Sequence, residues 1–271
     1  MAPPDLDVIA LRDLAVALAS EGAERVRARA GAADLRITAK STATDPVTEV
    51  DEEVEALVVA GLLAARPDDG VAGEEGADRA GTSGVTWLID PIDGTVDFVY
   101  GIPGCNVSVA AMVAGQVVAG AVIDPLHGDT FAAARGHGAT RNGHPIRCTA
   151  VTDPALALVA TGFGYDPVER ARQAQVLAHV LPRIRDIRRI GAAALDLCWV
   201  GCGRLDAYFE RNLMPWDWAA GALVAEEAGA VVVGLGDRPL PGSLPHATVV
   251  AAGPALIGPL ADLLVEAGEH P

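Results

Sequence analysis

Two carboxylates three residues apart, Asp90 and Asp93, stand where an apolar run ends. The run covers residues 85–89 and is typical of a buried strand, which a proline then interrupts. Gly94 and Thr95 follow and open the next segment. Carboxylates at a strand end, beside backbone amides, suit the binding of a divalent cation against a phosphate group. A surface turn with two solvated acids is the simpler interpretation of the same motif.

Further acids stand at the expected ends of other elements. Glu74 and Glu75 lie between two glycines after an apolar segment, and Asp217 lies in the sequence PWDWAAG. Taken alone, the first motif is typical of an exposed loop and Asp217 of a helix N-cap. If Glu74, Asp217 and the Asp90–Asp93 pair met, two bare carboxylates about 4 Å apart would repel by roughly 4 kcal/mol at an effective dielectric constant near 20. All-oxygen ligation with room for water would then select Mg²⁺ over zinc.

The composition points to a large apolar core and to an acidic surface. The chain has 271 residues, is 51% hydrophobic and carries a formal net charge of −16. One domain, or two closely packed halves, is expected at this length. The charge argues against nucleic acid or an anionic membrane as a main partner. A phosphate substrate would be repelled as well, unless divalent cations reversed the charge locally.

The periodicity predicts strands that alternate with helices, which is the α/β class with antiparallel hairpins. Helices are expected over residues 5–30, 48–66, 167–181, 191–201, 216–229 and 255–267, and strands over 34–40, 156–160, 204–210, 231–233 and 248–251. The apolar stretch 107–123 is expected to form two buried strands joined by a turn at 114–116, and not a membrane helix. A soft boundary near residues 148–153 separates an N-terminal half (1–148) from a C-terminal half (149–271) of a single domain.

The second helix starts at a capping-box-like pair, Thr48 and Asp51. Its acids between residues 49 and 55 are expected to form mostly a solvated face, with Asp51 set apart as a candidate for function. The four cysteines show no Cys-x-x-Cys spacing, so we expect buried free thiols in a reduced compartment. The first ten residues lack the pattern of a signal peptide, and we expect a cytoplasmic protein.

The chain resembles the inositol monophosphatase family of Mg²⁺-dependent, lithium-sensitive phosphatases. The resemblance rests on WLIDPIDGT, on the later PWDWAAG, on the preceding GEE and on an upstream Lys-x4-Asp-x2-Thr pattern, and it extends from Lys40 to Gly229. It implies a layered α-β-α-β-α fold with mixed sheets, two or three Mg²⁺ ions per site and a homodimer. A small phosphorylated polyol would be the substrate, with no nucleic acid or membrane as partner.

The resemblance also implies roles for individual residues. The metal ligands would be Glu74, Asp90, Asp93, Asp217 and the backbone carbonyl of Ile92. The residues of catalysis would be Glu74, Asp93, Thr95 and Asp51, of which Thr95 with Glu74 or Asp51 would orient a water. Substrate contacts would come from Asp93, Gly94, Thr95, Gly191, Ala192, Ala193, Glu210 and Asp217. Glu75 and Lys40 would support the metal ligands from outside.

The implied reaction is hydrolysis of a phosphate monoester by direct attack of a metal-activated water, without a covalent phosphoenzyme. Inositol 1-phosphate is the first substrate to consider, because Glu210 matches the family's acceptor for sugar hydroxyls. Histidinol phosphate, fructose 1,6-bisphosphate and 3′-phosphoadenosine phosphate remain alternatives, since enzymes of the same architecture act on them.

The chain departs from the family pattern at three positions. Val96 and Asp97 stand where Thr-Asn is common, and Asn212 stands where Gly is common. Asn tolerates a left-handed backbone, so we expect the turn to survive. Arg211, beside it, could meet a second anionic group on a substrate.

Two other classes of protein fit the sequence less well. An aspartyl-phosphate phosphatase of the haloacid dehalogenase type is disfavoured, because Pro91 stands where its nucleophilic Asp would be. A non-catalytic interaction protein on the same fold is a more distant alternative, because every ligand position is filled.

Overall fold

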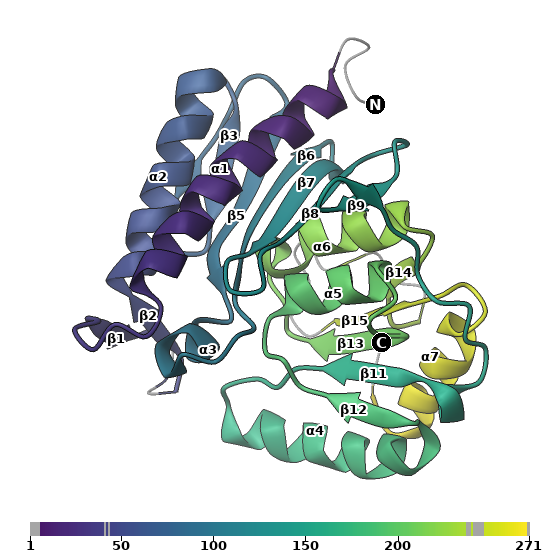
Figure 1. Cartoon of the computed structure of the whole chain (residues 1–271). Coiled ribbons are helices and arrows are strands. Elements are labelled where there is room, and N and C mark those ends of the chain that lie inside the picture. The colour runs from purple at the N-terminus through teal and green to yellow at the C-terminus, as the bar shows by residue number, and fades with distance from the viewer. Residues whose placement is uncertain (1–5, 41, 43, 237–239, 241–246, 270–271) are drawn as a thin grey trace.

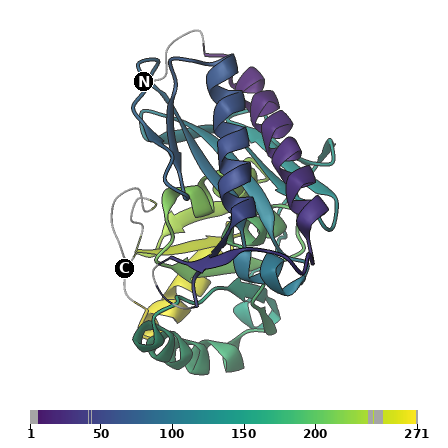
Figure 2. The same cartoon turned by 90° about the vertical axis from the view of Figure 1, so that its left-hand side faces the viewer.

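A computed structural model describes residues 6–40, 42, 44–236, 240 and 247–269. Within this part the elements form five layers, in the order α-β-α-β-α (Figure 1). The outer helices α1 (Val8–Arg29) and α2 (Glu49–Ala65) run beside each other over one face of the first sheet (Figure 2). Helices α5 (Ala193–Gly201) and α6 (Pro215–Glu227) lie between the two large sheets. The layered α/β fold with mixed sheets is therefore confirmed.

The first sheet has eight strands in the order β10-β9-β8-β7-β6-β5-β3-β4. They are β3 (Gly70–Gly73), β4 (Asp78–Arg79), β5 (Val85–Asp93), β6 (Asn106–Val113), β7 (Gln116–Asp124), β8 (Asp129–Ala134), β9 (Ala139–Arg141) and β10 (His144–Pro145). Strand β3 is parallel to β5, and every other pairing in this sheet is antiparallel. The hairpin expected over residues 107–123 is confirmed as β6 and β7. Its turn holds Ala114 and Gly115 at positive φ angles of 50° and 79°.

The second sheet has five strands in the order β12-β11-β13-β15-β14. They are β11 (Leu158–Thr161), β12 (Asp186–Arg188), β13 (Ala207–Arg211), β14 (Val231–Gly234) and β15 (Thr248–Ala252). Strand β11 is parallel to both of its neighbours, whereas β15 is antiparallel to β13 and β14. The outer face of this sheet is covered by α4 (Pro167–Val180) and α7 (Ile257–Glu266) (Figure 1).

Three apolar clusters fill the spaces between the five layers. One lies between α1, α2 and the first sheet, a second lies around α5 and α6, and the third lies under α4 and α7. The remaining elements are short: β1 (Ile37–Ala39) and β2 (Pro46–Thr48) form a two-stranded sheet, and α3 (Thr95–Tyr100) follows β5. Two 3₁₀ helices cover Pro154–Leu156 and Leu181–Arg183. No helix in the described ranges is both long and apolar enough to cross a lipid bilayer. The chain leaves the first sheet after Pro145 and enters the second at Leu158. The boundary between the two halves near residues 148–153 remains a prediction.

Candidate active site

The end of β5 is irregular, and this irregularity places two acids on the same side. Asp90 pairs with Ser108 and Asp93 with Asn106, so three steps along β5 match only two along β6. In a regular strand, residues three apart point to opposite faces of the sheet. The bulge re-aims the second acid. Asp90 and Asp93 therefore both line one pocket.

That pocket has a volume of about 330 Å³ and lies between the two halves of the chain. Ten residues expected in the site line it: Glu74, Asp90, Ile92, Asp93, Gly94, Thr95, Gly191, Ala193, Glu210 and Asp217. Four further expected residues, Lys40, Asp51, Glu75 and Ala192, are not among its lining residues. Lys40 bonds to Glu74 and Asp51 bonds to Thr95, both of which line the pocket, and Glu75 bonds to Lys40, whereas Ala192 is fully buried.

Asp93 accepts hydrogen bonds from strand β6 of the first sheet and from helix α5. The side-chain amide of Asn106 donates to its Oδ2 at 2.9 Å, and the backbone amides of Ala193 and Ala194 donate to Oδ1 and Oδ2 at 3.2 and 2.8 Å. The last two amides belong to the first turn of α5, where a carboxylate is favoured by the helix dipole. Burial nevertheless raises the pKa of Asp93 to about 7.

Thr95 connects the pocket wall to a buried acid behind it. Its Oγ1 lies 2.9 Å from the carbonyl oxygen of Ile92 and 3.1 Å from Oδ1 of Asp51. The other oxygen of Asp51 accepts the backbone amide of Thr48 at 2.9 Å, which confirms the capping box at the start of α2. Burial raises the pKa of Asp51 to about 6. Asp51 thus orients the Thr95 hydroxyl while it starts the helix.

The loop that carries Glu74 and Glu75 is fixed from two sides. Nζ of Lys40 donates to Oε1 of Glu74 at 2.8 Å and to Oε1 of Glu75 at 2.5 Å. On α2, the Glu55 carboxylate accepts hydrogen bonds from the backbone amides of Glu75 and Ala77 at 2.8 and 2.9 Å. The expectation that the acids of α2 are mostly solvated was wrong at Glu55, which is buried. Its position four residues after Asp51, on the same helix face, is the signal that could have identified it.

Glu210, at the end of β13, accepts a hydrogen bond from the phenol of Tyr208 at 2.7 Å. Burial raises the pKa of Glu210 to about 7, although the Tyr208 hydroxyl and the charge of Arg189 act in the opposite direction. Gly162 packs against this carboxyl so closely that a Cβ there would lie 2.0 Å from an oxygen. Gly162 was missed from sequence because only the fold brings it to Glu210. Tyr208 was missed as well, although its position two residues before Glu210 on the same strand face is a signal that could have identified it.

Asp217 lies in the first turn of α6, and the simpler interpretation of it as the N-cap is wrong. Met214 is the N-cap, and Oδ2 of Asp217 accepts the backbone amide of Met214 at 2.7 Å. This bond fixes the carboxylate three positions inside the helix, on the side that lines the pocket. The N-terminal turn of α6 therefore aims Asp217 at the end of β5.

The donor set in the pocket fits a hard divalent cation. Oδ1 of Asp90 is buried without a hydrogen-bond partner among the described residues. The pKa values of Asp90 and Asp217 are raised well above their usual range, first by burial and then by the charge of Glu74 and Asp93. The described residues contain no group of three His, Cys, Asp or Glu side chains already arranged around a single metal position. Glu74 instead bonds to Lys40, so a bound cation would compete with that ammonium group.

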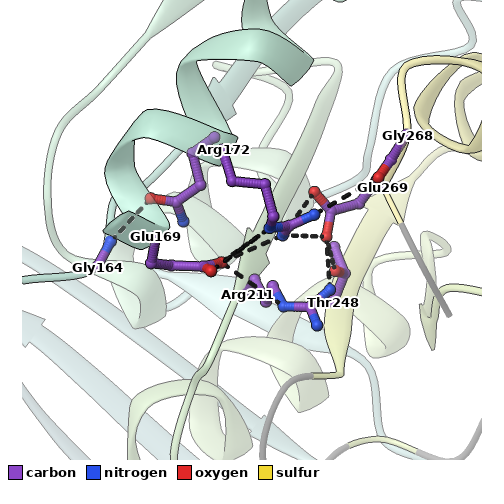
Figure 3. A network of polar contacts seen from close by, with 8 residues as sticks. Gly164, Glu169, Arg172, Arg211, Thr248, Gly268 and Glu269 are labelled. Atoms are coloured by element: carbon purple, nitrogen blue, oxygen red, sulfur yellow. Dashed lines mark hydrogen bonds and ion pairs between the residues drawn. The ribbon is translucent and has the colours of Figure 1, made fainter. Parts of the chain in front are cut away.

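Arg211 takes part in a network of polar contacts with side chains other than the proposed metal ligands (Figure 3). Its Nη1 donates to Oε1 of Glu269 at 2.9 Å, and its Nε lies 3.7 Å from Oε1 of Glu169. Arg172 and the hydroxyl of Thr248 bond to the same Glu269 carboxylate. The expectation that Arg211 meets a substrate anion is thus disfavoured by its present contacts.

The neighbouring turn behaves as expected from sequence. Asn212 has a φ angle of 66°, so it does adopt the left-handed backbone that a glycine commonly supplies at this position. Asp97, the other departure from the family pattern, is buried, and its Oδ2 has no hydrogen-bond partner in the part of the chain described.

Comparison with known proteins identifies relatives over nearly the whole chain. The model of the inositol monophosphatase family matches residues 7–269. The chain is 49% identical over 251 residues to inositol-1-monophosphatase SuhB of Mycobacterium tuberculosis, covering 86% of this chain and 87% of that protein. It is 40% identical over 197 residues to Nus factor SuhB of Vibrio cholerae, covering 72% and 74% of the two chains.

Solved structures agree with this fold. The structure of Mycobacterium tuberculosis SuhB has a TM-score of 0.83 at 45% identity and covers 98% of this chain and 99% of its own. The extragenic suppressor protein suhB from Bartonella henselae has a TM-score of 0.88 at 31% identity, covering 94% and 98%.

Proposed function

Because the chain belongs to the inositol monophosphatase family, we propose that it is a Mg²⁺-dependent phosphatase of a small phosphorylated polyol, with inositol 1-phosphate as the first candidate. The observation that carries this proposal is the convergence of Glu74, Asp90, Asp93 and Asp217 on one pocket, from three separate segments: the loop after β3, strand β5 and helix α6. These four side chains, with the carbonyl of Ile92, would hold the metal. Bound Mg²⁺ would supply Lewis-acid activation of water and would stabilise the leaving oxygen.

The charge of the pocket explains why a cation is required. Among the described residues that line it, only two are basic, Arg189 and Arg211. Eight are acidic: Asp45, Glu74, Asp90, Asp93, Asp166, Glu169, Glu210 and Asp217. A phosphate monoester would be repelled by this wall in the absence of divalent cations. We therefore expect no hydrolysis in the absence of divalent cations, and not merely a slower reaction.

The protein's own groups orient the reactants. The Asp93 carboxylate is held by three donors, so its direction is set before substrate binds. The Thr95 hydroxyl lies between the Ile92 carbonyl and Asp51, and it can pass a proton to Asp51. The backbone amides of Gly94 and Thr95 would face the phosphate. Together these groups would place an attacking water in line with the scissile bond.

Glu210 favours a substrate with several hydroxyl groups. Tyr208 already donates to one of its oxygens, which leaves the other to accept hydrogen bonds from a polyol. Gly191 and Ala193 would form the backbone wall beside it. This supports inositol 1-phosphate over histidinol phosphate, which has fewer hydroxyl groups to offer.

The resemblance also supports a homodimer, inhibition by Li⁺ and a cytoplasmic location, which we include in the proposal. Some relatives are named Nus factor, and that name belongs to those proteins. The net charge of −16 disfavours direct contact between this chain and a nucleic acid. We therefore keep the absence of nucleic-acid binding as a prediction.

A phosphate-release screen tests the proposal. The purified chain is incubated with inositol 1-phosphate, histidinol phosphate, fructose 1,6-bisphosphate and 3′-phosphoadenosine phosphate, each with Mg²⁺ and with EDTA. We expect release from inositol 1-phosphate with Mg²⁺ and none with EDTA. Absence of release from all four substrates with Mg²⁺ would overturn the proposal.

A further inference from the structure

Arg189 is the arginine of the catalytic pocket whose donors are not engaged. Among the described lining residues, Arg189 and Arg211 are the two bases, and Arg211 already contacts Glu269 and Glu169. Arg189 is exposed, and within the part of the chain that the structure describes it donates no hydrogen bond and forms no ion pair within 4.0 Å. Its guanidinium group can therefore donate to a ligand in the pocket.

Gly191 provides the space that the Arg189 side chain occupies in the pocket wall. A Cβ atom at residue 191 would lie 2.2 Å from Nη1 of Arg189 and 3.4 Å from Oδ2 of Asp97. The φ angle of Gly191 is 96°, in the left-handed region that favours glycine. The guanidinium group therefore packs directly against the glycine backbone, and the Asp97 carboxylate lies close to the same point.

Three acids from separate elements lie within range of the Arg189 charge: Asp97 on α3, Asp196 on α5 and Glu210 on β13. Burial raises the pKa of each carboxyl group, and the positive charge of Arg189 acts in the opposite direction. Oδ2 of Asp97 and both carboxylate oxygens of Asp196 are buried without a hydrogen-bond partner among the described residues. Because unpaired buried carboxylates are costly, they favour a guanidinium group beside them. The three acids thus stabilise the observed position of Arg189.

Arg189 and Glu210, which line the same pocket, have opposite hydrogen-bonding roles. A guanidinium group only donates, and an ionised carboxylate only accepts. A hydroxyl group does both. Two hydroxyl groups on adjacent carbons of a ring can therefore bind to both side chains, one by donating to Glu210 and the other by accepting from Arg189. A flat apolar ligand would leave both side chains without a partner.

We propose that Arg189 is a substrate-binding residue that donates to a hydroxyl group adjacent to the one bound by Glu210, and that Asp97 is a positioning residue that holds Arg189. The inference rests on the proposed function and narrows its substrate class to polyol phosphates with hydroxyl groups on adjacent carbons. Asp97 stands where the inositol monophosphatase family commonly has Asn. An ionised carboxylate attracts a guanidinium group more strongly than a neutral amide can. This departure from the family pattern thereby has a physical role.

Two phosphates with the same ring size test the inference. Inositol 1-phosphate carries hydroxyl groups around its ring, whereas cyclohexyl phosphate has none. The ratio of their kcat/KM values is measured with Mg²⁺ for wild type, R189Q, D97N and the double variant. R188Q is the matched control, because Arg188 is exposed, bonds to Asp186 and is not among the pocket's lining residues. Circular dichroism melting verifies that each variant is folded.

We expect wild type to prefer inositol 1-phosphate and R189Q to reduce that preference about tenfold, mainly through KM. D97N should reduce it about threefold. In the double variant D97N should add little to R189Q, because Asp97 acts through Arg189. The control R188Q should leave the preference unchanged.

The role of Arg189 is overturned if R189Q leaves the preference unchanged or lowers kcat/KM equally for both phosphates. The role of Asp97 is overturned if the effects of D97N and R189Q on the preference multiply in the double variant. If wild type releases phosphate from neither compound, the proposed function fails. Calorimetry of inositol 1-phosphate binding with Mg²⁺ then decides the inference: weaker binding by R189Q than by wild type supports it, and equal or absent binding overturns it.

Discussion

The Oδ2 atom of Asp93 accepts a hydrogen bond from the backbone amide of Ala194 at 2.8 Å, across 101 residues of sequence. This bond joins the end of β5, in the first sheet, to the first turn of α5, which leads into the second sheet. The pocket is therefore built where the two halves of the chain meet. Its geometry depends on the packing of both halves, and not on either one alone.

Asp93→Asn should abolish Mg²⁺-dependent phosphate release while the fold survives. The amide keeps one acceptor oxygen for Ala194 but loses the negative charge that a cation requires. We expect a loss of more than about 100-fold in kcat with inositol 1-phosphate, and a melting temperature close to that of wild type. Turnover near the wild-type value would contradict the role given to Asp93.

Glu55→Gln should increase the Mg²⁺ concentration that activity requires, although Glu55 is not a proposed metal ligand. The substitution replaces one of the two oxygens that accept the amides of Glu75 and Ala77 with an NH₂ donor, and so loosens the Glu74 loop. We expect the Mg²⁺ concentration for half-maximal activity to rise about tenfold. Glu53→Gln is the matched control, because Glu53 bonds to Arg25 at the surface of the same helix. Equal behaviour of the two variants would show that Glu55 does not position the loop.

Glu210→Ala should change substrate choice more than metal affinity. Removing the acceptor penalises a polyol phosphate but not 4-nitrophenyl phosphate, which has no hydroxyl groups to bind. We expect the ratio of kcat/KM for inositol 1-phosphate over 4-nitrophenyl phosphate to fall about tenfold or more, with little change in the Mg²⁺ requirement. If metal affinity collapsed instead, Glu210 would be a ligand.

Glu269→Gln should lower the stability of the fold in a pH-dependent way. Hydrogen bonds from Arg172, Arg211 and Thr248 hold the pKa of Glu269 below its usual value, against the opposing effect of burial. A depressed folded-state pKa contributes stability above the unfolded pKa of about 4.3, and this contribution is lost as pH falls through the folded-state value. The variant should unfold about 1–3 kcal/mol more easily at pH 7.

Chemical denaturation at pH 7 and at pH 3 measures this effect. The free energy of unfolding of wild type should exceed that of Glu269→Gln by its largest amount at pH 7 and by less at pH 3. Glu266→Gln is the control, since the Glu266 side chain is exposed and lies 3.9 Å from His179. A difference that stayed constant between the two pH values would argue against an ionised Glu269.

Much of the fold could be predicted from local patterns. The helix expected over residues 5–30 is observed as Val8–Arg29, and the one over 167–181 as Pro167–Val180. These helices have regular apolar spacing and clear start signals, such as the Asp7 and Asp166 N-caps. Local periodicity was enough because each helix buries one face against a sheet.

The contacts that depend on tertiary packing could not be predicted in the same way. The pairing of Arg211 with Glu269 joins residues 58 positions apart, and the position of Arg189 over Gly191 depends on a left-handed glycine with a φ angle of 96°. Neither contact is indicated by a periodic pattern in the sequence. The site acids were predicted through motifs, whereas the groups that hold them, such as Asn106 and Tyr208, are ordinary strand residues in the sequence.

The central claim is that dispersed acids form one cation site, and Asp90→Asn tests it through two effects of opposite sign. Without metal, the variant should melt at a higher temperature than wild type at pH 7. Burial and the neighbouring acids raise the pKa of Asp90, so folding at pH 7 must either bury its charge or take up a proton, and an amide has neither cost. With Mg²⁺, wild type should be stabilised by ligand binding and the variant should not.

Isothermal titration calorimetry of Mg²⁺ into wild type and Asp90→Asn measures the binding directly, and melting curves in EDTA and in Mg²⁺ accompany it. We expect a binding isotherm for wild type and none for the variant, although the variant is the more stable of the two in EDTA. Equal Mg²⁺ binding by both proteins would contradict the proposed convergence of the acids on a metal.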